Sequence, residues 1–488
     1  MSARFSWCLV PLLLTSNGMF SVPPTHSSQS VEPSAAPVRL TAAQDRERML
    51  RLLGLTDAQM RPAPVTNAKA PNAANYDEAK ANIYGPAPDP LLLHDGKRIT
   101  TAEEWWSQRR PEIVADFERE ILGRAPTHLP SVQWQVVSMD KEDYGGVPAI
   151  TKRLIGHVDN SADSAIPVDI QLLLTTPAHA PGPVPVIMEL AFAKDFEAAL
   201  QRPLPPVLPP GTPGQWGVDG RLVLQRGWGF AVLSPTSFQA DNGAGLTQGI
   251  IGLMNHGQPR SIDDWGALRA WAWGASRALD YFQTDPAVDA RQVGLEGHSR
   301  FGKTVLVVMA YDPRFAICYS SSSGEGGAKL YRHQFGEQIE NMTAANPPYH
   351  WFAGRFLRYG GPLTPRDLPV DANELIALAA PRPVFIGGGS TVGDGYANPN
   401  GDAWADPRGM FLAEVAAGPV YRLLGAKDLG TTKFPPVQTA LVTGELAFRE
   451  HPYGHTPAPN WPAFLEYASH YLHAPAHPQT LAKANPRP

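Results

Sequence analysis

Short hydrophobic runs alternate with longer amphipathic segments along most of the chain. Runs typical of buried strands occupy residues 149–158, 168–175, 184–192, 229–233, 292–295, 315–319, 384–386 and 440–448. Apolar residues recur at helical spacing in residues 262–282, 304–310 and 461–472. This alternation predicts an α/β protein, a three-layer sandwich around a mostly parallel central sheet.

Two of the predicted helices carry boundary signals. A helix over residues 111–122 has Pro111 at its start and Gly123 directly after its end. The helix over residues 262–282 follows Ser261, with Asp264 three residues on, which is a capping-box spacing. We therefore expect that helix to begin at residue 262.

The N-terminus has the layout of an export signal. Arg4 precedes an apolar stretch at residues 5–14, which is too short to span a bilayer. We interpret residues 1–28 as a signal peptide and leader, which predicts a secreted or periplasmic protein. No other segment has about 18 uninterrupted apolar residues, so we expect no membrane span.

Composition narrows the class of protein. The 488 residues are 43% hydrophobic, enough for a large buried core, and the net charge is −5 without a long charge run. A basic surface for nucleic acid is therefore not expected. Cys8 and Cys318 are the two cysteines, and removal of the leader would leave only one, so no intramolecular disulfide is predicted.

The most informative segment is residues 294–303, which follows an apolar strand and precedes an apolar helix. It contains Gly297 and, two residues later, Ser299. A serine at such a strand-to-helix turn is the nucleophile elbow of the α/β-hydrolase fold, although the second glycine stands at Gly302, one residue late. The turn exposes the hydroxyl, and the helix N-terminus offers N–H groups to a developing oxyanion.

A serine nucleophile needs a histidine base, which follows the serine and the acid in α/β-hydrolase chain order. His451 and His455 lie between the last predicted strand and the last predicted helix, where that base belongs. We favour His455, because Gly454 beside it permits a tight loop. The two histidines lack further ligands for a metal set, so we expect neither a metal nor another cofactor.

The residues leave more than one candidate for the acid that orients the histidine. It commonly follows the strand before the histidine-bearing strand, here residues 384–386. The following loop contains Asp394, Asp402 and Asp406, of which Asp394 is nearest to the strand end. Glu325, in a Gly-rich loop after the preceding strand, is the alternative acid.

Residues 297–303, Gly-His-Ser-Arg-Phe-Gly-Lys, resemble the G-[CH]-S-R-x-G-K signature of glucuronoyl esterases, the fifteenth carbohydrate esterase family. The likeness covers about residues 110–472. It implies an α/β-hydrolase domain over residues 131–475, preceded by an N-terminal extension at residues 29–130 and followed by a tail at residues 476–488. It also implies a carboxylic ester hydrolase that needs no metal.

Site roles follow from the same resemblance. It assigns Ser299 as nucleophile and His455 as base, and it makes Arg300 the oxyanion-hole arginine. It assigns sugar binding to Lys303 and to Glu337.

Two positions depart from the family pattern. Ser322 occupies the place where many members carry a catalytic glutamate. A later family segment, E-D-Q-W-x-N-P, is matched here to residues 393–399, so that Asp394 inherits the role of the acid and Tyr396 replaces the tryptophan of the sugar site.

The predicted reaction is hydrolysis of 4-O-methyl-glucuronoyl esters that link xylan to lignin alcohols, through an acyl-enzyme on Ser299. The expected partner is such a glucuronoxylan or lignin–carbohydrate ester, and we expect a monomer. Two alternatives stay open at this point: an esterase for acetylated xylan or another carbohydrate, and a catalytically silent carbohydrate-binding protein on a hydrolase fold.

Overall fold

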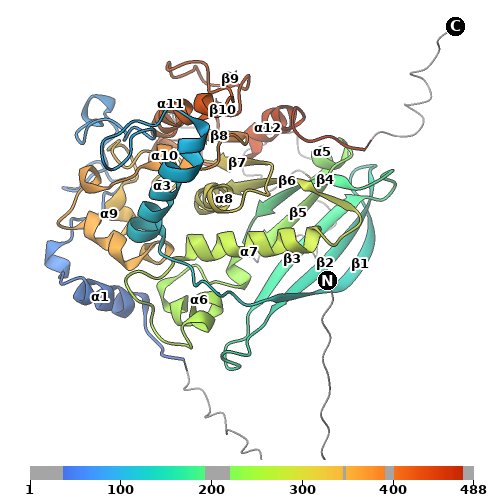
Figure 1. The fold of residues 1–488 in the computed structure, drawn as a ribbon, viewed down its shortest axis with the longest axis horizontal. Helices are drawn as coiled ribbons and strands as arrows, with labels where there is room; N and C mark the ends of the chain where they lie inside the picture. The colour runs from blue at the N-terminus through green and yellow to red at the C-terminus, as the bar shows by residue number, and fades with distance from the viewer. Residues whose placement is uncertain (1–36, 193–219, 345–347, 391–400, 476–488) are drawn as a thin grey trace, which may run out of the picture. The chain divides into compact units, whose positions relative to one another are not determined.

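The computed structural model describes residues 37–192, 220–344, 348–390 and 401–475. Within these residues one ten-stranded sheet has the order β1-β2-β3-β5-β4-β6-β7-β8-β10-β9 (Figure 1). Its strands are β1 (Val132–Asp143), β2 (Pro148–Val158), β3 (Asp169–Pro177), β4 (Val184–Leu190), β5 (Gly229–Ser234), β6 (Val288–His298), β7 (Ile317–Ser321), β8 (Val384–Gly389), β9 (Ala440–Leu441) and β10 (Leu446–His451).

The sheet has a parallel centre and antiparallel margins. Every neighbouring pair from β5 through β4, β6, β7 and β8 to β10 is parallel. β1, β2, β3 and β5 pair antiparallel on one side, and β9 pairs antiparallel with β10 on the other. Ligands bind at the carboxyl ends of parallel strands in such open sheets, and β6, β7 and β8 end there side by side.

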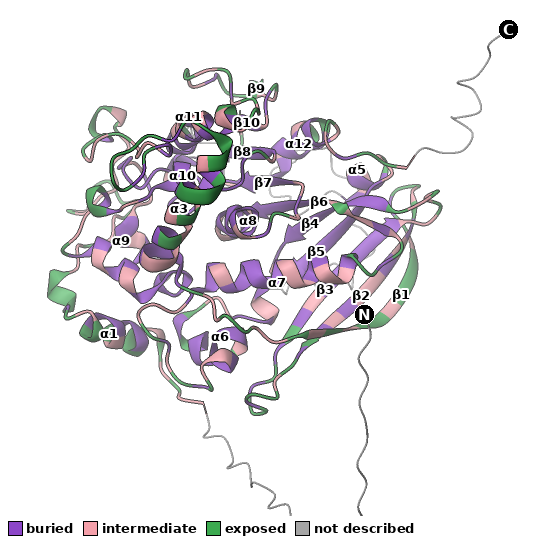
Figure 2. Cartoon of the chain, viewed as in Figure 1, coloured by how far each residue is buried: buried purple, intermediate pink, exposed green. Residues whose placement is uncertain are grey.

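Helices cover both faces of the sheet, as a three-layer α/β-hydrolase fold requires. On β4, Met188 packs into the larger core, which also contains residues of α7 and α8, while Ile187 packs into the second core with α5 and α12. Every residue of β4 is buried, and burial on both faces explains why the strand is apolar except for Glu189 (Figure 2). The α-helices are α1 (Ala42–Leu52), α2 (Ala102–Glu104), α3 (Arg110–Phe117), α5 (Gly220–Leu224), α6 (Gly249–Met254), α7 (Ala267–Phe282), α8 (Arg300–Tyr311), α9 (Ile339–Met342), α10 (Ala372–Ala377), α11 (Pro407–Leu423) and α12 (Trp461–Ala468).

The described part of the N-terminal extension has no core of its own. Met49 of α1, Phe117 of α3 and Trp105, which precedes α3, are buried in the same cluster as α7 and α8. Polar contacts add to this packing, since the Arg109 guanidinium pairs with the buried carboxylate of Glu374 in α10. Residues 37–130 are therefore packed as part of the sheet domain.

Two sequence-based boundaries were wrong. The helix expected from residue 262 begins at Ala267, because residues 263–265 instead hydrogen-bond to Arg124 along the chain. Asp264 accepts from the Ser261 backbone N–H in a local turn that does not continue as a helix. The strand expected over residues 440–448 is divided into the short β9 and the central β10.

The predicted leader, residues 1–28, lies outside the described residues. Within the described part of the chain, none of the helices is both long and apolar enough to cross a membrane.

Trp105 and Trp106 give a test of how the extension is integrated. Trp105 is 0% exposed and Trp106 is 49% exposed. Trp105→Ala should cost about 3–5 kcal/mol of unfolding free energy, because it empties a buried aromatic site. Trp106→Ala should cost less than about 1 kcal/mol, since the ring mainly contacts the Arg110 guanidinium at the surface.

The measurement is thermal and denaturant unfolding of both variants beside the wild type. Equal midpoints for Trp105→Ala and the wild type would show that the extension does not share the core of the sheet domain.

Candidate active site

Ser299 lies at the turn between β6 and α8 with φ 56° and ψ −120°, a backbone conformation that non-glycine residues rarely adopt. Its N–H donates to the Ser321 carbonyl at the end of β7 at 2.8 Å, and its carbonyl accepts from the Lys303 N–H at 3.1 Å. The turn is thus fixed from both the sheet and the helix. This is the geometry expected of a nucleophile elbow.

The glycines of the turn are needed for close packing. A Cβ on Gly297 would lie 2.3 Å from the Phe301 carbonyl oxygen, and one on Gly302 would lie 2.8 Å from the Ser321 carbonyl oxygen. Phe301, where the usual motif has glycine, packs its ring against Trp271 with centroids 5.5 Å apart. The second glycine that the turn needs is therefore Gly302, one residue after the position that it has in the usual motif.

The His455 imidazole is held by a buried carboxylate. Its Nδ1 lies 2.8 Å from Oδ1 of Asp402, whose side chain is only 1% exposed. The other carboxylate oxygen, Oδ2, accepts from the Ser322 hydroxyl at 2.5 Å and from the Gly389 N–H at 2.8 Å. Asp402 therefore fixes the tautomer in which Nδ1 carries the proton, and Nε2 is the basic nitrogen.

The imidazole also lies beside the nucleophile's turn. The rings of His455 and His298, the residue before Ser299, have centroids 4.3 Å apart. Burial, together with the charges of His455 and His451, holds the pKa of His298 well below its ordinary value. A neutral His298 ring thus packs against the His455 imidazole.

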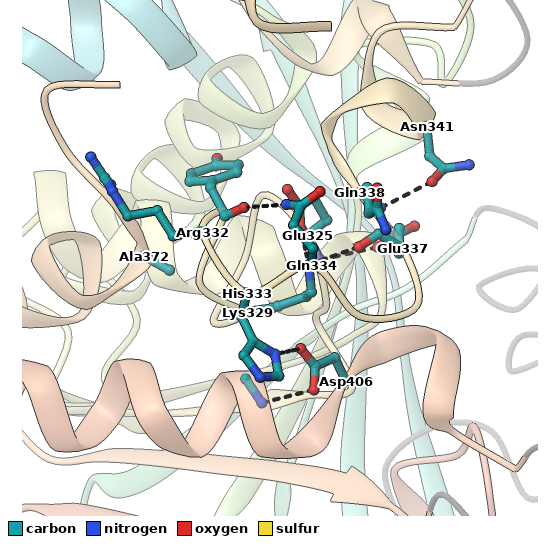
Figure 3. Close-up of polar contacts among 12 residues, drawn as sticks. Glu325, Lys329, Arg332, His333, Gln334, Glu337, Gln338, Asn341, Ala372 and Asp406 are labelled. Carbon is teal, nitrogen blue, oxygen red and sulfur yellow. Dashed lines mark hydrogen bonds and ion pairs between the residues drawn. The ribbon is translucent and has the colours of Figure 1, made fainter. Parts of the chain in front are cut away.

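Asp394, the acid predicted from the sequence, lies outside the described residues. The carboxylate that pairs with His455 in the structure is that of Asp402. The carboxylate of Glu325, the alternative acid, is completely buried in an ion pair with the Lys329 ammonium group (Figure 3). Burial raises the pKa of Glu325 well above its ordinary value, against the opposing effect of Lys329.

A sequence signal for Asp402 was present. Residues 402–407 read Asp-Ala-Trp-Ala-Asp-Pro, which matches the D-x-W spacing of the family segment and retains its tryptophan. The family segment was instead matched to residues 393–399, because Asn398-Pro399 fits its final Asn-Pro. Ser322, seen only as a departure from the family pattern, is the hydroxyl that binds Asp402.

The second candidate base, His451, has a structural role. It is the last residue of β10 and is 0% exposed. Its Nε2 lies 2.8 Å from the Thr456 carbonyl oxygen, and its Nδ1 accepts from the Tyr453 N–H at 3.1 Å. His451 therefore shapes the loop that carries His455.

Arg300, directly after Ser299, is held on several sides. Its guanidinium pairs with the Asp241 carboxylate. The guanidinium carbon lies 5.2 Å from the Trp351 ring centroid and 5.4 Å from that of Phe192. Sequence analysis missed both Asp241 and Trp351, because neither belongs to a recognisable motif.

Lys303 and Glu337 meet one α-helical turn beyond Ser299. The Lys303 ammonium group lies 3.3 Å from Oε2 of Glu337, which also accepts from the Glu325 N–H at 3.0 Å. Oε1 of Glu337 accepts from the Trp404 indole N–H at 3.3 Å. Burial lowers the pKa of Lys303, and Glu337 opposes this shift. The two residues named from the sequence thus lie together, while Tyr396 lies outside the described residues and Trp404 supplies the aromatic ring.

Comparison with known proteins identifies the family. The family model described as glucuronyl esterase, fungi, matches residues 259–425. A carbohydrate esterase from an unknown prokaryotic organism is 32% identical over 453 residues, which cover 88% of this chain and 98% of that protein. The chain belongs to carbohydrate esterase family 15, the glucuronoyl esterases. It is a carboxylic ester hydrolase with the α/β-hydrolase fold.

Two further relatives extend the comparison within the family. A glucuronoyl esterase of the same family from Teredinibacter turnerae has a solved structure that superposes with a TM-score of 0.78 at 40% identity. It covers 88% of this chain and 99% of its own. A 4-O-methyl-glucuronoyl methylesterase from Wolfiporia cocos is 27% identical over 397 residues, covering 79% of this chain and 83% of that protein.

A metal site is not evident within the described residues. No group of three or more His, Cys, Asp or Glu side chains there is arranged to hold an ion.

A buried histidine links the extension to the segment that carries Asp402. Nδ1 of His333 lies 2.6 Å from Asp406, the N-cap of α11 (Figure 3). Its Nε2 lies 3.2 Å from Glu78 of the extension. Burial alone would lower the pKa of His333. The hydrogen bond and charge of Asp406, joined by Glu78, outweigh burial and the opposing charge of Lys329, so that the pKa is raised.

This shift predicts a pH-dependent stability. The pKa of His333 in the folded state is above its unfolded value of about 6.5. Charged His333 therefore stabilises the fold fully below about pH 6.5, and this stabilisation is lost as the pH rises through the folded-state pKa. The thermal midpoint of the wild type should exceed that of His333→Gln most at pH 6, and the gap should narrow toward pH 9. A gap that widens over the same range would contradict the charged state of His333.

Proposed function

We propose that this enzyme hydrolyses esters of 4-O-methyl-glucuronic acid through a covalent acyl-enzyme on Ser299. The observation that carries the proposal is the hydrogen bond between His455 and the buried Asp402, made beside the strained turn that bears Ser299. The acyl group is proposed by analogy with the Wolfiporia cocos relative, a 4-O-methyl-glucuronoyl methylesterase.

In the first step His455 Nε2 accepts the Ser299 proton while the serine oxygen attacks the ester carbonyl carbon. Backbone N–H groups at the start of α8 and the Arg300 guanidinium stabilise the negative oxygen of the tetrahedral intermediate. The resulting imidazolium then protonates the leaving alcohol, and the acyl-enzyme forms. In the second step His455 deprotonates water, which attacks the acyl carbon. The bond between the acyl carbon and the Ser299 oxygen then breaks, His455 returns the proton to that oxygen, and the uronic acid is released.

Asp402 stabilises the imidazolium in both steps. The carboxylate does not take up the Nδ1 proton of His455, and its other oxygen accepts hydrogen bonds from Ser322 and Gly389. Its side chain is almost completely buried, so the ionic contact with His455 is little screened by water.

The sugar ring is assigned to the group formed by Lys303, Glu337 and Trp404. Lys303 supplies donors and Glu337 supplies acceptors for hydroxyl groups, and an indole ring offers an apolar face for a pyranose. This donor and acceptor set favours a hydroxylated uronoyl group over the small acetyl group of acetylated xylan, because an acetyl group has no hydroxyl groups for it to bind.

We also propose a natural substrate, a location and an oligomeric state for the enzyme. The natural ester links a glucuronic acid side chain of xylan to a lignin alcohol, and the protein acts outside the cytoplasm after removal of residues 1–28. It works as a monomer, since each proposed role falls to a residue of one chain.

Paired assays test the acyl specificity. With purified enzyme, kcat/KM for benzyl glucuronate should exceed that for 4-nitrophenyl acetate by at least about 10-fold, because hydrogen bonds to sugar hydroxyls reject ligands that lack them. Ser299→Ala should abolish both activities. A preference for the acetate would favour the acetyl esterase, and full activity of Ser299→Ala would exclude the proposed mechanism.

A further inference from the structure

We propose that Asp241 is a positioning residue for catalysis, which acts by holding Arg300 and Trp351 in place. This inference rests on the proposed role of Arg300 as an oxyanion donor. It extends that role to a residue that is far away in the sequence and does not belong to the motif of the elbow.

Three side chains converge on the Asp241 carboxylate. Oδ2 pairs with the Arg300 guanidinium. Oδ1 accepts from the Trp351 indole N–H at 2.7 Å and lies 2.9 Å from Nε2 of His350. Because the partner of Nε2 is a carboxylate that only accepts, His350 donates from that nitrogen.

Asp241 is ionised at every pH at which the enzyme is expected to work. Burial alone would raise its pKa, but the hydrogen bond from His350, the charge of Arg300 and the hydrogen bond from Trp351 lower it to about 2. Burial lowers the pKa of His350, so this ring is a neutral donor. The ion pair with Arg300 is therefore permanent.

The backbone around Asp241 is fixed by its neighbours. Asp241 follows β5 in a segment whose Gln239 carbonyl accepts from the buried Trp271 indole N–H at 2.8 Å. The Gln239 side chain binds Ile251 and Gly245, and the Asn242 side chain caps the next turn at Gly245. Such a segment can hold a carboxylate at a defined position relative to α8.

The Arg300 side chain needs a fixed carboxylate of this kind to hold it in one conformation. Its side chain is 34% exposed, and a long side chain of this kind loses about 2 kcal/mol of conformational entropy when it is ordered. Asp241 fixes the guanidinium directly and also orients the Trp351 ring that lies against it. The same ring centroid lies 5.6 Å from the Lys303 ammonium group. One carboxylate thus organises the cation of the oxyanion site and the aromatic contact of the proposed sugar site.

The test is a double-mutant cycle with Asp241→Asn, Arg300→Gln and the double variant, assayed for kcat and KM on benzyl glucuronate. Asp241→Asn should lower kcat by about 10- to 100-fold and change KM by less than about 3-fold, since the loss falls on transition-state stabilisation. In the Arg300→Gln background, Asp241→Asn should lower kcat by less than about 3-fold, because it acts through Arg300.

A matched control is Asp263→Asn, which removes the carboxylate partner of Arg355 in an ion pair outside the site. It should leave kcat and KM near the wild-type values. A merely structural role of Asp241 would lower kcat by the same factor in both backgrounds. That result would overturn the inference, and so would an unchanged or increased kcat in Asp241→Asn.

If Asp241→Asn does not fold, His350→Phe provides the second variant. It keeps the carboxylate but removes one of its N–H donors, so kcat should fall less than in Asp241→Asn, and this loss should also disappear in Arg300→Gln. Additive losses would again overturn the inference. A wild type that does not hydrolyse benzyl glucuronate would exclude the proposed function instead, and the cycle would then be measured on the ester that it does hydrolyse.

Discussion

The active site depends on the strained backbone of Ser299. A positive φ at a serine costs about 1–3 kcal/mol and persists only where the surroundings over-determine it. Here the end of β7 accepts the serine N–H, α8 starts at the next residue, and Gly297 and Gly302 allow the sheet and helix to approach closely. The parallel strands and α8 thus provide a rigid base that holds the hydroxyl above the sheet.

Each functional group around this turn is held by a second polar group from another part of the chain. Asp402 holds His455, Ser322 holds Asp402, and Asp241 holds Arg300. Charges as buried as these are costly unless they are paired and hydrogen-bonded. The same rule applies to Lys329, which binds both the Glu325 carboxylate and the Glu337 carbonyl oxygen and so secures the loop behind the proposed sugar site.

Sequence reasoning succeeded where local pattern decides the structure. The strands from β2 to β8 were located from their apolar runs, which are clearest in the fully buried β4, β5, β7 and β8. The elbow was located because its glycines are close in sequence. β1 was missed, since most of its residues are exposed and show no apolar run. The start of α7 was misplaced because pairing with Arg124 overrides a local capping signal.

The acid illustrates the limit within the site. Asp394 and Asp402 lie in similar sequence segments, and the pairing of Asp402 with His455 is a contact in space that the local sequence pattern does not report. Asp241 could not be found from the sequence, because its function depends on three partners that are 59 residues or more away along the chain. Pairings of this kind are properties of the sheet topology, which brings the loops after β5, β6, β7 and β8 to one edge.

The rate at which a fluorophosphonate modifies Ser299, followed by mass spectrometry of the intact protein and its peptides, tests the central claim most directly. The adduct should lie on the peptide that contains Ser299, and its formation should be slowed by about 10³-fold or more in His455→Gln and Asp402→Asn. Glu325→Gln should slow it far less. An adduct on another residue, or a larger effect of Glu325→Gln than of Asp402→Asn, would contradict the account.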